Sequence, residues 1–322
     1  MDARLGPSDG AGRALRMGAM VAVLNVLIDP ILPIFAIMAF GYALGMSGKT
    51  SVEDARTINH FALTVPLPIM LFGLLGAAPI RSIHPVPALV YIGAEAVVFA
   101  IGFALAYGVF RRGPAESVLL AFCGIFANNV FYVLPIATLL YGKAQVLPVT
   151  TIIIIDTTVT MAGALVALQI INLGRITPGA VIRTLARTPI LQAIALGILF
   201  NLARIPIPGA VQTFIDFNGH AAAPIALFAL GVVMSQTRLA MDAMVLCFTL
   251  LKLIVFPAVV WVGMEALAGA ADGKAQFLLG SAGPAGAMAF SLALHQNVRT
   301  DAIAQIIIWT SVLTLVSLAV LA

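Results

Sequence analysis

The chain has 322 residues, of which 61% are hydrophobic and 9% are charged, and its formal net charge is +4. A soluble domain carries roughly 25% charged residues, so this composition excludes an ordinary soluble protein and is typical of an integral membrane protein. The basic residues stand mostly singly at the ends of apolar segments, as membrane topology requires, so the positive charge does not indicate a nucleic-acid partner.

Residues 1–21 are predicted to form a flexible tail, because three arginines stand there among glycine, serine and aspartate. The apolar run that follows reaches about Gly45 and is longer than the hydrophobic region of a signal peptide, so we do not expect cleavage. One membrane span needs about 20 mostly apolar residues. The sequence predicts ten spans with short breaks between them, at 22–46, 57–78, 86–110, 116–141, 148–172, 179–203, 210–235, 243–268, 276–295 and 301–321.

Two short strings inside these spans indicate an internal repeat. They read PIMLFGL from Pro68 and PIALFAL from Pro224, share five of seven positions and start 156 residues apart. Five spans precede Gly174 and five follow it, and an odd number of spans per repeat forces the second copy to insert upside down. We therefore predict an all-α membrane protein with ten transmembrane helices in two inverted five-helix repeats, 22–172 and 179–322, joined by a linker at 173–178.

Lysine and arginine predict the orientation of these spans. With both termini on the non-cytoplasmic side, the cytoplasmic loops hold nine basic residues and the opposite loops hold four. The tail adds three arginines to the non-cytoplasmic side, but the positive-inside rule is read from the short loops. We therefore expect both termini outside the cytoplasm.

The fourth span carries two adjacent amides, Asn128 and Asn129, shortly before Pro135. Proline removes a backbone hydrogen bond and opens the helix. In lipid, a freed backbone is tolerated only where it is buried in protein or lines a cavity. The amides either satisfy this freed backbone or bind a substrate.

The ninth span contains a matching interruption, because Gly280–Gly286 reads GSAGPAG and is a poor helix former. Interrupted helices at equivalent positions of two repeats point to a transporter site. Their half-helix N-termini, near Pro284 and Ala285 in this span, would offer free N–H groups to a carboxylate. The alternative is that both interruptions are kinks that serve helix packing.

Three ionisable residues lie well inside predicted spans: Glu95, Asp156 and Lys252. Burying a charge there costs at least about 2.5 kcal/mol, so such residues usually face a cavity or a partner. They form either a structural ion pair or a coupling site. In the second case Asp156 and Glu95 would take up and release a proton or a cation in each cycle, and Lys252 would balance a carboxylate.

The remaining features have simpler interpretations. His295, at the end of the ninth span, is either an interfacial cap or a member of the site. Cys123 and Cys247 both fall in apolar segments and are predicted to be buried thiols rather than a disulfide. The GxxxG pattern at Gly41 and Gly45 favours close helix packing. The sequence holds no Walker motif, no Cys/His cluster and no hydrolase motif, so we expect neither an enzyme nor a bound metal or cofactor, apart from a coupling proton or Na⁺.

Several of these segments resemble the auxin efflux carrier family, whose bacterial members are related to PIN-type exporters and malonate-type carriers. The resemblance covers about residues 24–322. It rests on the order and spacing of several short motifs rather than on any single one. These are Ile58–Phe61 with Val65–Pro68, Asn128 with Pro135-Ile136 and Leu140–Gly142, Leu251–Leu253 with Pro257, and Gly283–Ala285 with Phe290.

The resemblance implies that the helices form two parts with different functions. Spans 1, 2, 6 and 7 would form a scaffold that also makes a homodimer, and spans 3–5 and 8–10 would form a transport domain that moves as an elevator. Broken helices 4 and 9 would cross at the substrate site. The chain departs from the plant exporters in its short linker between spans 5 and 6, so regulation by phosphorylation there is not expected. It also has Ala127 where the plant proteins often have proline.

The sequence thus predicts a secondary transporter of small organic anions, such as malonate, malate or an auxin-like acid. Asn128, Asn129 and the backbone near Pro135, Pro284 and Ala285 would hold the carboxylate. The alternative is a cation-coupled symporter or a cation/proton antiporter of the same crossed-helix fold, and a paired-carboxylate ion site would be its distinguishing feature. We expect the protein in the bacterial inner membrane, in contact with lipid.

Overall fold

The computed structural model describes residues 36–142, 145–173, 179, 183, 186–236, 240–269, 271 and 273–321. This described part is helical throughout and has no β-strand, only one isolated antiparallel bridge between Ala127 and Ala285. The predicted tail at 1–21 and residues 174–178 of the predicted linker lie outside the described residues.

Helix is found within each of the ten ranges that the sequence predicts to be spans. The first half of the chain contains a helix Ala36–Met46, α2 (Val52–Thr64), α3 (Pro66–Ala77), the short η1 (Ile80–Ser82), α4 (Pro85–Ala104) with the π-turn η2 (Leu105–Val109), α5 (Pro114–Ile125), the π-turn η3 (Asn129–Val133), α6 (Leu134–Tyr141), α7 (Leu147–Ile155), the π-turn η5 (Asp156–Thr160) and α8 (Met161–Leu173). The second half contains α10 (Pro189–Ala203), α11 (Gly209–Gly219), α12 (Ala222–Met234), α13 (Ala243–Leu250), the π-turn η6 (Leu251–Val255), α14 (Phe256–Leu267), α15 (Lys274–Ala282), α16 (Met288–His295) and α17 (Asp301–Leu321).

Five of the described helical segments are long and apolar enough to cross a membrane. They are Val52–Ala77, Pro85–Val109, Leu147–Asn172, Gly209–Met234 and Ala243–Leu267. Shorter apolar helices accompany them at Ala36–Met46, Pro114–Ile125, Pro189–Ala203 and Asp301–Thr314. This supports the prediction of an all-helical integral membrane protein.

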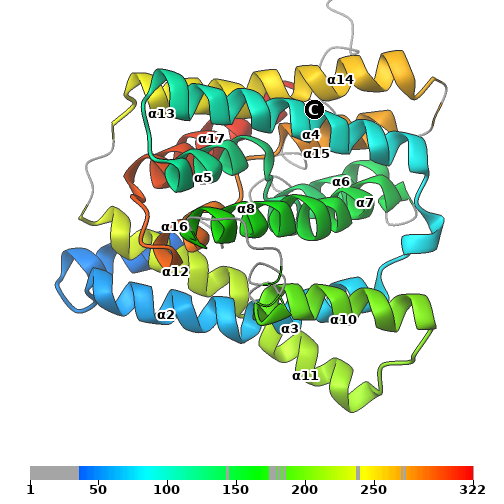
Figure 1. Ribbon diagram of the computed structural model, residues 1–322, viewed down its shortest axis with the longest axis horizontal. Coiled ribbons are helices and arrows are strands. Elements are labelled where there is room, and N and C mark those ends of the chain that lie inside the picture. Colours follow the sequence, from blue (N-terminus) through cyan, green and yellow to red (C-terminus); the bar gives the residue numbers. More distant parts are fainter. Residues whose placement is uncertain are drawn as a thin grey trace, which may run out of the picture.

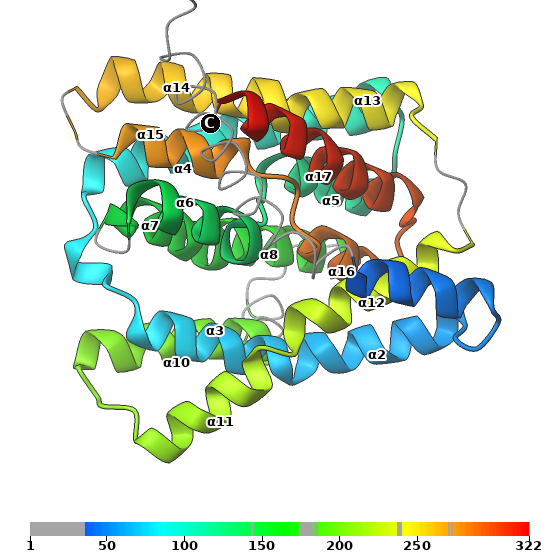
Figure 2. The same ribbon diagram turned by 180° about the vertical axis from the view of Figure 1, so that it is seen from behind.

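The helices are arranged in two bodies, one above the other in Figures 1 and 2. The lower body holds α2, α3, α10, α11 and α12, and the upper body holds α4, α5, α13, α14, α15 and α17. Helices α6, α7, α8 and α16 lie between them, and α16 contacts both α2 and α12. The contacts of α16 therefore join the bodies in the middle of the molecule.

Local sequence signals place several helix starts. Ser51 caps α2, because its hydroxyl accepts the N–H of Asp54 at 3.1 Å while Asp54 accepts the N–H of Ser51 at 2.8 Å. This reciprocal pair satisfies two N–H groups that a helix start leaves free. Proline occupies the first position of α4, α5 and α10, where its missing N–H costs nothing.

Small residues allow the helix Ala36–Met46 to approach α12 closely. A Cβ atom added to Gly41 would collide with the carbonyl oxygen of Phe228, and one added to Gly231 would collide with that of Met38. A Cβ added to Gly45 would collide with the side chain of Ser235. The prediction that the GxxxG pattern serves helix packing is therefore confirmed.

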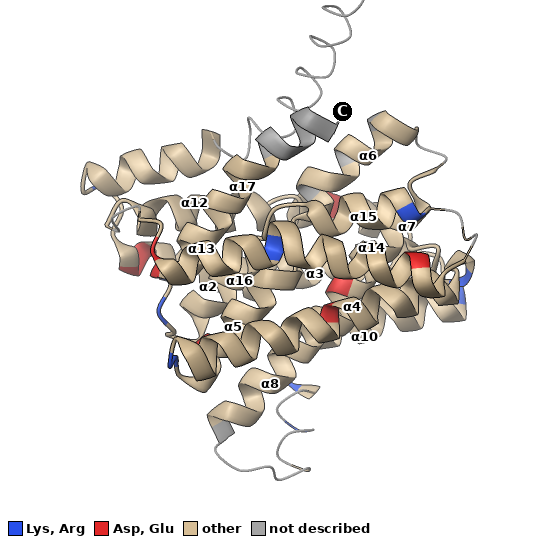
Figure 3. Cartoon of the chain, turned by 90° about the horizontal axis from the view of Figure 1, so that it is seen from above, with Lys and Arg blue, Asp and Glu red and all other residues tan. Residues whose placement is uncertain are grey.

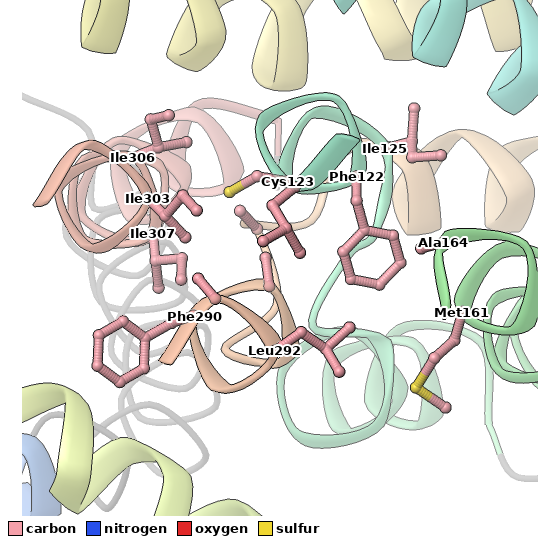
Figure 4. Packing of buried hydrophobic residues seen from close by; sticks show 14 of the residues in the cluster. Phe122, Cys123, Ile125, Met161, Ala164, Phe290, Leu292, Ile303, Ile306 and Ile307 are labelled. Carbon is pink, nitrogen blue, oxygen red and sulfur yellow. The ribbon is translucent and has the colours of Figure 1, made fainter. Parts of the chain in front are cut away.

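The apolar core joins the middle layer to the upper body. Figure 4 shows Phe122 and Cys123 of α5, Phe290 of α16 and Ile303 of α17 pointing into one cluster. All four side chains are fully buried. Cys123 and Cys247 are both free thiols, as the sequence predicts, but only Cys123 is buried, and Cys247 is half-buried.

Charged residues lie mostly toward the ends of the molecule, with few in its middle (Figure 3). Among the described residues, the buried charged side chains are Glu95, Asp156 and Lys252, which are 3%, 2% and 0% exposed. Such residues are expensive inside a membrane protein and usually functional. They therefore mark the region where a site is expected.

Candidate functional site

The site begins with two interrupted helices that meet. Helix α5 ends at Ile125 and helix resumes at Asn129, while α15 ends at Ala282 and helix resumes at Met288. The two extended breaks pair with each other around the Ala127–Ala285 bridge. The N–H of Asn128 donates to the Pro284 carbonyl at 2.8 Å, and the N–H of Gly286 donates to the Phe126 carbonyl at 3.0 Å. Each break therefore satisfies part of the other's backbone inside the protein, as a membrane interior requires.

The sequence explains why the helix is interrupted at the second break. Pro284 has no N–H to donate to a helix, and glycine stands on either side of the pair Pro284-Ala285. A Cβ atom added to Gly286 would lie 2.7 Å from Cδ1 of Phe126. The close approach of the two breaks thus requires a residue without a side chain at position 286.

Both resumed half-helices begin with N–H groups that lack a partner. The N–H groups of Asn129, Val130, Ala287 and Met288 make no hydrogen bond within the described residues. A helix start also carries the positive end of the helix dipole. Two such starts at one place form a natural binding site for an anion.

A cavity of about 80 Å³ lies where these half-helices face the lower body. One wall consists of the two breaks and the start of α16, and a second wall comes from α7, η5 and α8. The third wall comes from α2, α3 and α12. The lining residues are Ala62, Leu63, Leu67, Met70, Leu71, Phe126, Ala127, Asn128, Asn129, Val130, Ile153, Asp156, Thr157, Met161, Ala222, Ala223, Ala226, Leu227, Gly286, Ala287, Met288 and Ser291.

Three polar side chains of this cavity are available to a ligand or connect it to the interior. The amide of Asn128 makes no hydrogen bond within the described residues. Ser291 is fully buried, and its hydroxyl has no partner in the described part of the chain. Asn129 donates from Nδ2 to Oδ2 of Asp156 at 2.8 Å. The site therefore offers free donors beside a carboxyl group.

Asp156 and Glu95 form a carboxyl pair behind the cavity wall. The two carboxyl groups lie close enough to interact electrostatically, and Oε1 of Glu95 and Oδ1 of Asp156 have no hydrogen-bond partner within the described residues. Thr160 donates to Oε2 of Glu95 at 2.7 Å. Two ionised carboxylates at close range repel each other, so such a pair favours a state in which one of the two groups is protonated. The arrangement is suited to holding and releasing a proton next to the cavity.

Lys252 lies close to this pair but does not bind it directly. Its ammonium group donates to the carbonyl of Ser281 at 3.0 Å and to that of Ile125 at 3.3 Å. It also lies 4.6 Å from the centre of the Phe256 ring. The two carbonyls belong to the C-terminal ends of α15 and α5, where a positive charge is favourable. Lys252 thus holds both interrupted helices together and attracts Glu95 and Asp156 electrostatically.

The structure places the predicted site residues in three groups. Asn128, Asn129 and Asp156 line the cavity. Pro284 and Ala285 lie behind its wall, where Ala285 donates its N–H to Thr310 at 3.1 Å, and the lining is made by the next residues along the chain. Glu95 and Lys252 are also outside the lining but belong to the same buried cluster. Pro135 is the second residue of α6, and its side chain is outside the described part.

Sequence reasoning missed the wall that the lower body contributes. Met70 and Leu71 come from the first repeated string, and Ala226 and Leu227 occupy the equivalent positions of the second string. All four line the cavity. The two repeated strings are therefore the feature of the sequence from which this wall could have been predicted, because both strings line the same cavity.

His295 lies outside the cavity lining. Its Nδ1 is 3.2 Å from Nδ1 of His60, and the two rings stack. Nearby, Arg56 donates to Oδ1 of Asn297 at 2.5 Å. These contacts join α2 to the turn after α16. Within the described residues, no three His, Cys, Asp or Glu side chains are grouped as a metal site would need.

Comparison with known proteins shows to which family the chain belongs. The profile of a family described as "Membrane transport protein" matches residues 26–178 and 175–322. A protein of Rhizobium meliloti (strain 1021) described as "Putative malonate transporter" is 26% identical over 254 residues, which cover 75% of this chain and 77% of that relative.

Two further relatives are described only as transporters. The "Uncharacterized transporter YfdV" of Escherichia coli (strain K12) is 27% identical over 256 residues, which cover 75% of this chain and 80% of the relative. An "Uncharacterized transporter" of Methanothermobacter thermautotrophicus is 24% identical over 309 residues, which cover 94% of this chain and 97% of the relative.

Proposed function

Because the chain belongs to the membrane transport protein family, the family of the auxin efflux carriers, we propose that it is a secondary transporter of small organic anions. The cavity at the paired helix breaks is its substrate site, and no chemical conversion takes place there. One observation carries this proposal: two half-helix starts with free N–H groups and the unbonded amide of Asn128 face one cavity. This arrangement suits a carboxylate.

The buried carboxyl pair supports proton coupling. Asp156 lines the cavity and lies next to Glu95, while Asn129 connects Asp156 to the half-helix that carries Asn128. An anion next to an ionised acid pair is repelled, and an anion next to a protonated pair is not. Binding of the substrate and of a proton therefore favour each other.

The proposed architecture has ten transmembrane helices in two inverted repeats. The helix Ala36–Met46, α2–α3, α10 and α11–α12 serve as the scaffold, and the remaining helices form the transport domain that moves as an elevator. The repeated strings in α3 and α12, which face the cavity from the scaffold side, support this division. The scaffold also forms a homodimer, and the protein lies in the bacterial inner membrane with both termini outside the cytoplasm.

A second candidate function is a cation-coupled symporter or a cation/proton antiporter of the same fold. The specific observation that favours it is that Glu95 and Asp156 are both buried and close enough to interact electrostatically, because paired carboxylates are the kind of group that binds a small cation. In that case the acids, rather than Asn128, would be the primary ligands.

Uptake by purified protein in liposomes separates the two candidates. A panel of labelled mono- and dicarboxylates plus indole-3-acetate is offered with a proton gradient, a sodium gradient or no gradient. Uptake of an acid that depends on one gradient supports the anion carrier and identifies its coupling ion. Sodium flux or a pH change without uptake of any acid supports the antiporter instead.

A further inference from the structure

We infer that the substrate is a short-chain monocarboxylate with an apolar tail, and not a dicarboxylate. This inference rests on the proposed function, because it assumes that the cavity holds the transported anion. It goes further by using the charge, the polarity and the size of the cavity walls to choose among carboxylates.

Charge is the first argument. Among the described residues that line the cavity there is no lysine, arginine or histidine, and the one ionisable residue is the acid Asp156. Lys252, the buried cation of the described part of the chain, lies outside the lining and donates to two backbone carbonyls. A single carboxylate is served by the half-helix starts, but a second one would lack any cationic partner. Burying an unpaired charge is very costly, so a dianion is strongly disfavoured.

The distribution of polar groups is the second argument. The donors are on one side, where Asn128 and Ser291 lie with the two half-helix starts. In the described structure, the opposite wall, from α2, α3 and α12, presents only alanine, leucine and methionine side chains. These are Ala62, Leu63, Leu67, Met70, Leu71, Ala222, Ala223, Ala226 and Leu227. A ligand that fits both walls has a carboxylate at one end and hydrocarbon at the other, because hydrocarbon gains free energy by leaving water.

Size is the third argument. The cavity volume is about 80 Å³. One water needs about 10–15 Å³, and a cavity of about 150 Å³ in another protein holds benzene. The cavity therefore accommodates an acid with a few heavy atoms and is too small for an indole ring. The fit is to a short aliphatic acid rather than to an auxin-like one.

The name of the Rhizobium relative mentions malonate, and the cavity of this chain argues for a different substrate here. The second carboxylate of malonate would have to face either the apolar wall or Asp156. A 2-oxo acid such as 2-oxobutyrate has a similar size but ends in a methyl group. The two compounds therefore form a matched pair that differs mainly in the charge at the far end.

The test measures initial uptake of labelled pyruvate, 2-oxobutyrate and malonate into proteoliposomes, with protein-free liposomes as the blank. These 2-oxo acids are almost fully ionised at neutral pH, so they cross lipid slowly by themselves. We expect 2-oxobutyrate to enter at least about tenfold faster than malonate, because a tenfold ratio needs only a small part of the cost of an unpaired charge. Equal or faster uptake of malonate would overturn the inference and leave the proposed anion carrier standing. Uptake of none of the acids would overturn both.

A variant adds an independent measure of the apolar wall. Met70→Ala enlarges the cavity at that wall and should raise the rate ratio of 2-oxohexanoate to pyruvate about tenfold, since two more methylene groups can be buried. Met264→Ala, at a buried methionine of α14 outside the lining, is the matched control and should leave the ratio unchanged. Melting temperatures confirm that both variants are folded. An unchanged ratio in a folded Met70→Ala protein would contradict the placement of the hydrocarbon tail.

Discussion

Asn129 donates a hydrogen bond of 2.8 Å to Asp156. This bond connects the proposed anion site at the helix breaks to the carboxyl pair that is proposed to bind the proton. Asn129 begins the half-helix that follows the first break, next to the unbonded amide of Asn128. Asp156 belongs to the carboxyl pair with Glu95. A change in the charge of the pair therefore acts directly on the segment that lines the cavity.

Asn128→Ala removes the free amide at the cavity. We expect at least about tenfold slower uptake with the fold intact, because a hydrogen bond to a charged group contributes about 1.5–3 kcal/mol. Initial uptake rates in proteoliposomes, together with the melting temperature, give the measurement. Asn218→Ala is the control, since Asn218 bonds only within α11. Wild-type uptake by Asn128→Ala would move the substrate site elsewhere.

Asp156→Asn removes the acid that faces the cavity but keeps an acceptor for Asn129. We expect the variant to equilibrate substrate but not to accumulate it when the proton concentration is higher outside. The wild type should accumulate substrate more strongly as the external pH falls, because the protonated carboxyl pair does not repel the anion. Asp216→Asn, at an exposed aspartate of α11, should behave as wild type. Unaltered accumulation by Asp156→Asn would make Asp156 a structural residue.

Lys252→Met leaves the carbonyls of Ile125 and Ser281 without their donor and the carboxyl pair without a nearby cation. An unpaired buried polar group costs about 1–3 kcal/mol, so the melting temperature should fall by several degrees. The difference in melting temperature between the wild type and Lys252→Met should become smaller at acidic pH, because a fully protonated carboxyl pair carries no negative charge for a cation to balance. Lys49→Met, at an exposed site, is the control. A melting temperature that Lys252→Met leaves unchanged would mean that the ammonium is not needed to hold the breaks together.

Gly231→Ala tests the close packing of α12 against the helix Ala36–Met46. The added Cβ would collide with the backbone carbonyl of Met38, which cannot rotate away as a side chain can. Overpacking of this kind costs about 1–3 kcal/mol, so thermal stability in detergent should fall. Gly163→Ala in α8 meets nothing within 4 Å and should be neutral or slightly stabilising. Equal effects of the two substitutions would contradict the described contact.

The sequence predicts the class of the molecule and the interior polar residues well, because both depend on local composition. Hydropathy is enough to locate helices within each predicted range, and a charge inside an apolar span is rare enough to be noticed. Glu95, Asp156 and Lys252 could therefore be selected without coordinates, and they do lie in one buried cluster.

Partners across the chain could not be predicted in the same way. The sequence did not indicate that Lys252 would donate to the ends of two interrupted helices, because that contact depends on how α5, α15 and η6 meet. It also suggested Pro284 and Ala285 as ligand-facing residues, whereas Gly286, Ala287 and Met288 form the lining. Which residues of an extended break face the cavity depends on the segment with which the break pairs, here the segment around Ala127.

The most direct test of the account records the internal pH of proteoliposomes with a trapped dye while labelled 2-oxobutyrate uptake is measured. With equal pH on both sides, external substrate should enter and acidify the lumen in the wild-type protein. Asn128→Ala should slow both signals at least about tenfold, and Asp156→Asn should retain substrate entry without acidification. Substrate entry by the wild type without any acidification, or acidification that persists in Asp156→Asn, would contradict the coupling of anion and proton at this site.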